Sequence, residues 1–250
     1  HLAQDNKIIE KRVKALLLTE DSTVFGGVDP DEVIKCRIGK SYESIILQMS
    51  NISSFYRYSH SVIIVGGTLK SDAGIDVWKY NPVVKKSGSV FHRIPNSSNF
   101  IESNNILYSG LHEGIFEFDK FNLNNLPNSS IDVFRVARLF LTRNNKILVG
   151  NLFGLWSYND GCITAYDTSN AFLKSRITDI AEYKRKYLCL GTRGKGLLLI
   201  ENDSTCQITD THGLVSSNIR RIFIEDNHIW LATNQGISIV TVHSEKPLLY

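Results

Sequence analysis

The chain has 250 residues, and its 42% of hydrophobic residues is enough to form a packed core and excludes a disordered polypeptide. Its 28 Lys and Arg are scattered among 25 Asp and Glu, so it lacks the basic stripe with which proteins follow nucleic acid phosphates. The longest apolar runs, such as Val62–Val65 and Leu197–Ile200, are far shorter than the roughly 18 residues of a membrane-spanning helix. No charged-then-apolar leader precedes them, so targeting and anchoring segments are expected to lie outside this chain.

A recurring marker divides the chain into six stretches of similar length. Each marker is a short apolar run that ends in a small residue, and these residues are Gly26, Gly66, Gly110, Gly150, Gly191 and Ala232. The spacings between successive markers are 40, 44, 40, 41 and 41 residues. A second glycine follows five of them, at Gly74, Gly114, Gly154, Gly196 and Gly236, and Asp31 stands near that place in the first. Such a constant period indicates a repeat architecture.

The strands expected within one repeat lie on both sides of the marker. An apolar strand precedes the marker run, most clearly at Val13–Leu18, Val136–Leu141 and Ile219–Ile224. Residues that favour tight turns separate the two strands, as in Ser103-Asn104-Asn105 and Glu225-Asp226-Asn227. An alternating strand such as Leu155–Tyr158 follows the second glycine, and a weaker fourth strand comes next. Each repeat therefore predicts four antiparallel strands, and no stretch has the period of an amphipathic helix.

Four antiparallel strands in about 40 residues are the size of one propeller blade, whose small sheet is stable when it packs against neighbouring blades. The sequence thus predicts an all-β protein, a β-propeller of about six four-stranded antiparallel blades. Part of a seven-bladed or larger propeller is the alternative. Residues 1–250 are expected to form a single domain, with repeats at residues 11–50, 51–95, 96–131, 132–170, 171–212 and 213–250.

The last repeat resembles a known family. From Gly213 to Ile237 the chain runs Gly-Leu, a Ser/Asn turn, a strand, an Asp and then Ile-Trp-Leu-Ala-Thr-Asn-Gln-Gly-Ile, which is similar to the two-component regulator propeller repeat. Other repeats match in part, at Gly191-Thr192 with Gly196-Leu197, at Gly150 with Gly154-Leu155-Trp156, and at Gly110 with Gly114-Ile115. The similarity covers essentially the whole chain, and one departure is Ala232, where the family has glycine.

The resemblance implies a function in signalling. Propellers of this family form the extracytoplasmic sensor region of bacterial receptors, often histidine kinases of the Bacteroidetes type. The chain is therefore expected to be a periplasmic or extracellular, non-catalytic part of a membrane-anchored receptor. Its expected partner is a small extracellular ligand such as an oligosaccharide, and the parent receptor is expected to be able to form a homodimer. A protein-interaction scaffold and a propeller enzyme acting on polysaccharide or a lactone are the alternatives.

Loops gathered at one face of a propeller commonly carry its binding residues. The ligand-binding candidates in the loops between second and third strands are His112, Glu113, Asn151, Phe153, Arg193, Lys195, Asn234 and Gln235. The alternative interpretation is that these residues only turn the chain. No catalytic residue, metal site or cofactor is assigned, because no nucleophile elbow, acid pair or zinc-type Cys/His spacing is present. Nucleic acid and direct membrane contact are not expected.

Three further features are expected to be structural. The run from Gly191 to Gly196 resembles a phosphate-binding loop, but it has the wrong spacing and a strand rather than a helix follows it. Tryptophans 78, 156 and 230 are expected to pack between blades, with an aromatic platform for a sugar as the alternative. The four cysteines are expected to be small core residues. Cys162 and Cys206 hold matching places in neighbouring repeats, but neighbouring outer strands usually lie too far apart for a disulfide.

Overall fold

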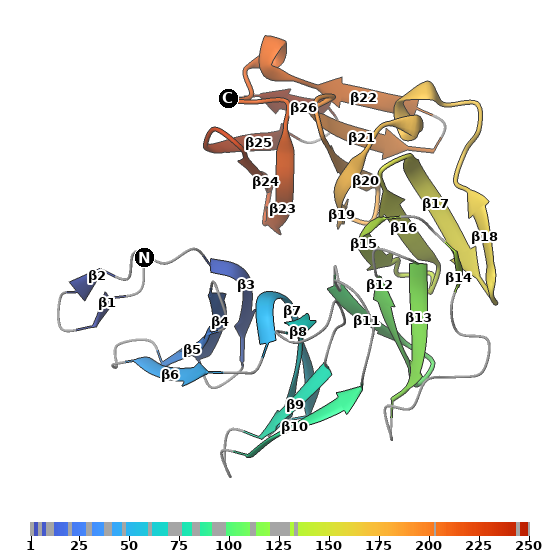
Figure 1. Cartoon of the computed structure of the whole chain (residues 1–250). Coiled ribbons are helices and arrows are strands. Elements are labelled where there is room, and N and C mark those ends of the chain that lie inside the picture. Colours follow the sequence, from blue (N-terminus) through green and yellow to red (C-terminus); the bar gives the residue numbers. More distant parts are fainter. Residues whose placement is uncertain are drawn as a thin grey trace. The chain divides into compact units, whose positions relative to one another are not determined.

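The computed structural model forms two compact units, His1–Ser129 and Ser130–Tyr250 (Figure 1). The residues that the structure describes are 3–4, 7–8, 13–19, 22–28, 32–37, 42–46, 49–59, 62–69, 77–81, 86–91, 99–110, 114–120, 131–132, 135–202, 204–243 and 246–249. In these residues, strands are accompanied by two short 3-10 helices, η1 (Ala171–Lys174) and η2 (Asp210–His212). The predicted all-β class is confirmed.

The first unit is built of antiparallel sheets whose strands follow one another in chain order. The first four-stranded sheet consists of β3 (Val13–Leu18), β4 (Thr23–Val28), β5 (Glu32–Arg37) and β6 (Tyr42–Ile46). The second consists of β7 (Met49–Ser59), β8 (Val62–Leu69), β9 (Val77–Asn81) and β10 (Lys86–Phe91). Three further antiparallel strands are β11 (Asn99–Ser103), β12 (Ile106–Gly110) and β13 (Gly114–Asp119). A two-stranded pair, β1 (Ala3–Gln4) and β2 (Lys7–Ile8), precedes them.

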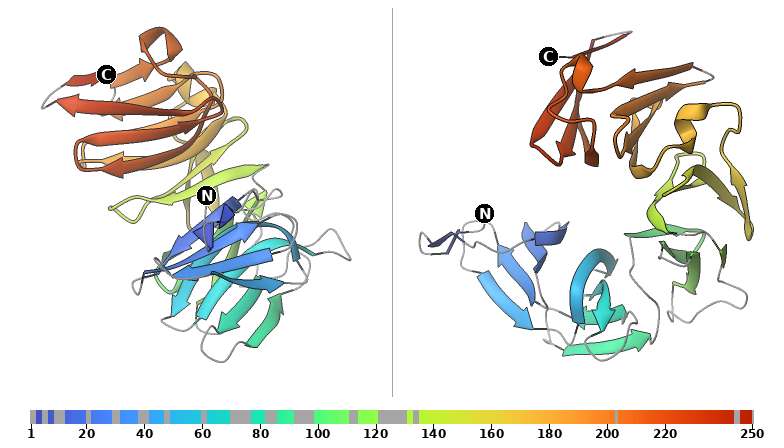
Figure 2. Two further views of the ribbon diagram at one scale, coloured as in Figure 1. Left: turned by 90° about the vertical axis from the view of Figure 1, so that its left-hand side faces the viewer. Right: turned by 45° about the horizontal axis from the view of Figure 1, so that its top comes forward.

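The second unit contains three four-stranded antiparallel sheets, again in chain order, and the short strand β14 (Ile131–Asp132) precedes them. The first sheet consists of β15 (Val136–Leu141), β16 (Ile147–Asn151), β17 (Gly154–Asn159) and β18 (Cys162–Ala165). The second consists of β19 (Ile177–Tyr183), β20 (Tyr187–Thr192), β21 (Leu197–Glu201) and β22 (Ser204–Ile208). The third consists of β23 (Ile219–Glu225), β24 (His228–Thr233), β25 (Ile237–His243) and β26 (Lys246–Leu249). Figure 2 shows the strands of these sheets side by side.

Tight hairpins connect the first and second strands of the sheets, as the sequence predicts. Asn104 and Asn105 have φ of 51° and 62°, and Asp226 has φ of 49°. Asn and Asp accept this left-handed backbone better than most residues, because their short polar side chains bond the nearby backbone. The four-stranded antiparallel architecture expected from the repeats is thereby confirmed, while the number of blades in one ring and the single-domain organisation stay predictions.

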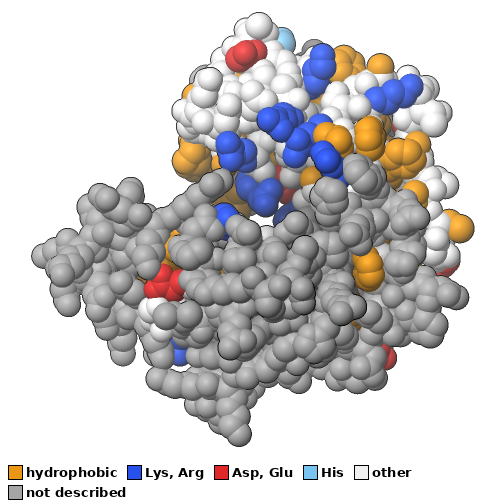
Figure 3. Space-filling view, in the orientation of Figure 1, with side chains coloured by type: hydrophobic (Ala, Val, Ile, Leu, Met, Phe, Trp, Pro, Cys, Tyr) orange, Lys and Arg blue, Asp and Glu red, His pale blue; other side chains and the backbone are white. Residues whose placement is uncertain are grey.

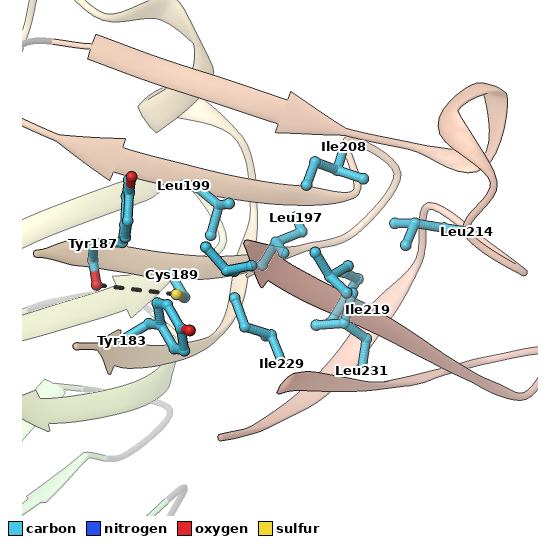
Figure 4. Packing of buried hydrophobic residues seen from close by; sticks show 12 residues of the cluster. Tyr183, Tyr187, Cys189, Leu197, Leu199, Ile208, Leu214, Ile219, Ile229 and Leu231 are labelled. Atoms are coloured by element: carbon cyan, nitrogen blue, oxygen red, sulfur yellow. Dashed lines mark hydrogen bonds between the residues drawn. The ribbon is translucent and has the colours of Figure 1, made fainter. Parts of the chain in front are cut away.

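Apolar side chains fill the space between adjacent sheets of the second unit. Between the sheets β19–β22 and β23–β26, the cluster shown in Figure 4 consists of Tyr183, Tyr187, Cys189, Leu197, Leu199, Ile208, Leu214, Ile219, Ile229, Leu231, Val240 and Val242. Between the sheets β15–β18 and β19–β22, a second cluster consists of Leu148, Leu155, Leu173, Ile177, Ile180, Leu190, Leu198 and Ile200. Strands β20 and β21 contribute to both clusters, so both faces of this sheet are buried, as in a propeller blade.

Glycines on the second strand of three sheets pack against an isoleucine of the next sheet. A Cβ added to Gly150 would lie 2.7 Å from Cγ2 of Ile177, and one added to Gly191 would lie 2.9 Å from Cγ2 of Ile219. In the first unit a Cβ on Gly27 would lie 2.6 Å from Cγ2 of Ile52. These distances are too short for real side chains, so glycine lets adjacent sheets approach.

The choice of Gly26 as the first marker is wrong by one residue. Gly27 pairs with Ala15 directly after a register shift in β3, and Gly150 and Gly191 occupy the same place opposite β15 and β19. A Cβ added to Gly26 would lie 3.5 Å from Cδ2 of Leu16, which is an ordinary contact distance. Both residues of the Gly-Gly pair fit the sequence pattern, and only the packing of Ile52 distinguishes them.

The expectation that all four cysteines are core residues is only half correct. Cys36 and Cys189 are buried, whereas Cys162 and Cys206 are exposed on the fourth strands β18 and β22. Burial raises the pKa of the Cys189 thiol to about 12. The fourth strands lie at the edges of their sheets, where alternate side chains meet solvent.

Candidate functional site

A polar hollow forms in the second unit where the segments that lead into β19 and β23 meet the turns between second and third strands. We call it the arginine hollow, and it has a volume of about 320 Å³. Its lining residues are Arg176, Thr178, Arg193, Asn218, Ile219, Arg220 and Asn234. The hollow therefore brings together residues that are up to 58 positions apart in the sequence.

Backbone hydrogen bonds hold these segments together. The amide of Arg193 donates to the carbonyl oxygen of Arg176 at 3.0 Å, and the amide of Asn234 donates to that of Asn218 at 3.2 Å. The amides of Gly194 and Gly196 both donate to the Ser217 carbonyl oxygen, at 3.1 and 2.9 Å. The turn after β20 is thus tied to its own sheet and also to the segment that begins the next sheet.

Side-chain hydrogen bonds fix the two polar residues that flank the arginines. The Thr178 hydroxyl donates to the Ile219 carbonyl oxygen at 2.7 Å, which joins β19 to β23. The Ser216 hydroxyl donates to Oδ1 of Asn234 at 2.7 Å. Because this bond occupies the acceptor oxygen of the amide, the Asn234 NH₂ group is the part that remains to donate to a ligand.

The hollow carries a concentrated positive charge. Burial lowers the pKa of the Arg176 guanidinium, and the like charges of Arg193 and Arg135 lower it further. Among the described residues, no carboxylate lies within ion-pair distance of Arg176, Arg193 or Arg220. Figure 3 shows Lys and Arg side chains gathered on the second unit in the region of β19 and β23. The arrangement can therefore donate many hydrogen bonds to an electron-rich ligand.

Two of the eight predicted site residues, Arg193 and Asn234, line the hollow. Their neighbours Lys195 and Gln235 are exposed in the same turns but are not part of the lining. The amides of Lys195 and Gln235 donate to the hydroxyls of Thr192 and Thr233 at 3.0 and 3.1 Å, so these residues have a role in turn structure. His112 and Glu113 lie outside the described residues.

Asn151 and Phe153 occupy the turn after β16, away from the hollow lining. Asn151 is buried, and its Oδ1 accepts from the amide of Phe153 at 2.8 Å and from Nε1 of Trp156 at 3.1 Å. The Asn151 side chain thus stabilises its own turn and orients the indole. Phe153 is 55% exposed.

Sequence reasoning missed Arg176, Thr178, Asn218 and Arg220, although a signal was available. Arg176 and Asn218 directly precede the inner strands β19 and β23, so they hold the same position in consecutive repeats. Thr178 and Arg220 are the second residues of those strands and are likewise equivalent. Aligning the residues that lead into each repeat, in addition to the second-to-third turns, identifies all four.

The other sequence motifs form no binding site in the parts of the chain that the structure describes. The run that resembles a phosphate-binding loop continues into strand β21, as the sequence predicts, and its buried Thr192 hydroxyl donates to the Gly196 carbonyl oxygen at 2.8 Å. The described residues contain no group of three or more His, Cys, Asp or Glu that could hold a metal ion. They also contain no helix with the length and apolarity needed to span a membrane.

The sheets and their packing define a β-propeller-like protein, and the similar structures agree. Solved structures with this fold include the extracellular domain of the hybrid two-component system BT4673 from B. thetaiotaomicron, with a TM-score of 0.75 and 20% identity over 97% of this chain and 34% of the other. They include the extracellular domain of BT3049 from the same organism, with a TM-score of 0.62 and 16% identity over 95% of this chain and 40% of the other. The chain thus spans a little more than a third of the length of these domains.

A third similar structure contains a bound peptide. Ycf48 bound to a D1 peptide has a TM-score of 0.72 and 11% identity, over 94% of this chain and 78% of the other. The sequence itself matches no protein family and no curated protein in the comparisons. The chain therefore shares its fold with extracellular domains of two-component systems, as the resemblance seen in the repeats implies.

Proposed function

We propose that this chain is the ligand-sensing part of the extracytoplasmic region of a bacterial two-component receptor, and that it acts by binding and not by catalysis. The observation that supports this most directly is the arginine hollow, a polar site of ligand size on a fold shared with extracellular receptor domains. Its lining side chains offer guanidinium and amide donors and carry no carboxylate, imidazole or thiol. The membrane anchor and the output domain would belong to the rest of the receptor.

An oligosaccharide is the ligand class that this proposal favours. The hydroxyl groups and ring oxygens of a sugar accept hydrogen bonds, and the hollow presents several donors on segments that backbone hydrogen bonds hold in place. A volume of about 320 Å³ accommodates one or two sugar rings.

A thermal-shift screen of the purified chain against a panel of neutral and acidic oligosaccharides tests the proposal. A ligand that binds only the folded state raises the melting temperature by mass action. Asn234→Ala should abolish the shift, because it removes a donor from the hollow, whereas Gln235→Ala in the same turn should retain it. No shift with any sugar, or equal loss in both variants, would contradict sensing at this site.

A protein-interaction scaffold is the second candidate, because several apolar side chains are exposed on the second unit. Val215, Phe223 and Ile237 are 48%, 63% and 64% exposed, and the similar Ycf48 structure contains a bound peptide. A contiguous surface of exposed apolar side chains is what another protein would cover. This candidate predicts a stable complex with the remaining extracytoplasmic part of the parent receptor. Ile237→Asp should weaken that complex without changing any sugar-induced thermal shift.

A further inference from the structure

Six arginines of the second unit differ in whether a carboxylate lies near them. Arg138 and Arg143 have acidic partners, since their Nε atoms lie 2.9 Å from Asp179 and 3.7 Å from Glu182. Arg221 lies near the same Asp179; burial lowers the pKa of its guanidinium, and the charge of Asp179 opposes that shift. The three arginines of the hollow have no such partner among the described residues. Carboxylates therefore lie near Arg138, Arg143 and Arg221, whereas the described residues place none beside the arginines of the hollow.

Like charges that lie close together in a partly buried site repel one another, and this repulsion affects the guanidinium of Arg176. Its pKa is lowered by burial and by the neighbouring guanidinium groups of Arg193 and Arg135. An anion between these groups would remove the repulsion and gain charge-assisted hydrogen bonds. Guanidinium groups also match the planar fork of a carboxylate and the oxygen triangle of a sulfate better than any other side chain.

The other lining groups also favour an anion. The Asn234 amide is turned by Ser216 so that its NH₂ group is left to donate. None of the seven lining residues is acidic. A neutral sugar would use these donors but would leave three positive charges without a counter-charge.

We propose that the arginine hollow binds an oxyanion group of the sensed ligand, a carboxylate or a sulfate ester, so that the receptor recognises acidic saccharides in preference to neutral ones. This inference rests on the proposed sensing function and specifies its ligand class. Arg193 and Arg220 are the residues expected to contact the anion from the exposed side, and Arg176 is expected to contact it from the half-buried side.

Calorimetric titration with matched sugars tests the inference. The probes are trigalacturonate with its neutral counterpart galactotriose, and a sulfated lactose with lactose, each at low and at high salt. At least one acidic probe should bind at least about tenfold more tightly than its neutral counterpart, and its affinity should fall as salt increases. The acidic probe that binds identifies whether the anion is a carboxylate or a sulfate.

The variants Arg193→Gln and Arg220→Gln should each weaken acidic binding about tenfold or more. Both side chains are exposed, so folding should be preserved. Arg185→Gln is the matched control, because Arg185 is an exposed arginine in the β19–β20 turn outside the hollow and its loss removes the same charge. Loss of binding in the control as well would show a general charge effect and would overturn the assignment.

The other outcomes separate the two proposals. Equal binding of acidic and neutral sugars that is unchanged in Arg193→Gln would overturn the anion site and leave the sensing function intact. Acidic binding that persists in both hollow variants would place the anion elsewhere and also overturn the inference. Absence of binding by every probe would contradict both the anion site and sugar sensing.

Discussion

The carboxylate of Asp179 lies 2.9 Å from Nε of Arg138, and this ion pair joins two inner strands of adjacent sheets. The other carboxylate oxygen accepts the backbone amide of Ile222, at 2.8 Å, from the third sheet. The three residues that follow the register shift in β15, β19 and β23 are Arg138, Asp179 and Arg221, so alternating charges occupy equivalent places in successive repeats. One buried carboxylate thus contacts all three sheets of the second unit.

Replacement of this carboxylate should destabilise the second unit. Asp179 is only 2% exposed, so Asp179→Ala leaves a partly buried guanidinium and a backbone amide without their acceptor. We expect a loss of about 3 kcal/mol in the free energy of unfolding, measured by urea denaturation. Asp179→Asn should lose less, because the amide oxygen can still accept from Ile222.

The matched control is Asp160→Asn, at an exposed turn residue with φ of 45° that Asn also adopts. Its stability should remain within about 0.5 kcal/mol of the parent chain. Similar small effects at both positions would show that Asp179 does not connect the sheets.

The two adjacent glycines of β4 should respond differently to the same substitution. In Gly27→Ala the new methyl group would press on Ile52 at 2.6 Å, and overpacking of this kind costs about 1–3 kcal/mol. In Gly26→Ala it would reach only ordinary contacts, so stability should stay the same or rise by up to about 1 kcal/mol. Equal melting temperatures of the two variants in calorimetry would contradict the packing of β7 against β4.

Thiol labelling should separate the cysteines into two pairs. Cys162 and Cys206 are exposed, so they should react with a maleimide in the native protein at neutral pH, whereas Cys36 and Cys189 should react only after unfolding. Partial burial raises the pKa of Cys206, which should slow its labelling relative to a free cysteine at the same pH. Peptide mass spectrometry identifies the labelled sites. Rapid native labelling of Cys189 would contradict the core between the sheets β19–β22 and β23–β26.

The Cys189 thiol should make the stability of the second unit depend on pH in the alkaline range. The pKa of Cys189 is raised to about 12 by burial, whereas an unfolded thiol ionises near about 8.5. The unfolded state therefore loses its proton first, and the second unit should lose stability as pH rises above about 9. Cys189→Ser does not ionise in this range, so it should show a flatter dependence in urea denaturation between pH 8 and pH 10. An identical slope would contradict burial of the thiol.

Glu102 should make the first unit sensitive to acid. The Lys120 ammonium and the Tyr56 hydroxyl both donate to this carboxylate and lower the pKa of Glu102 from its usual 4.5. A lowered native pKa gives stability that is present above about pH 4.5 and is lost as pH falls through the native value. Because the side chain is one-third exposed, the contribution should be under about 1 kcal/mol.

The measurement for Glu102 is the pH dependence of the melting temperature for the parent chain and for Glu102→Gln. The variant should lose part of its stability at neutral pH and show a shallower decline toward pH 3. Glu225→Gln, at an exposed carboxylate in the second unit, is the control and should follow the parent curve. A Glu102→Gln curve parallel to that of the parent would rule out this contribution.

Local patterns in the sequence were sufficient for the strands and their order. Apolar runs, turn residues and the 40-residue period depend only on neighbours in the chain, and a strand or hairpin is determined at that range. The strands around Gly150, Gly191 and Ala232 therefore lie where the repeat places them. The two predicted site residues in the hollow, Arg193 and Asn234, were found because they occupy turns of fixed position in that repeat.

The contacts between sheets were decided only by the tertiary structure. The choice of Gly27 over Gly26 depends on Ile52, the burial of Asp179 depends on Arg138 and Ile222, and the hollow depends on segments that come from two different sheets. No local pattern encodes such a pairing, because the partners are separated by at least 25 residues and meet only after the sheets pack. The sequence by itself therefore determined the repeating unit, and packing between the units determined which of its residues form the core, the ion pairs and the candidate site.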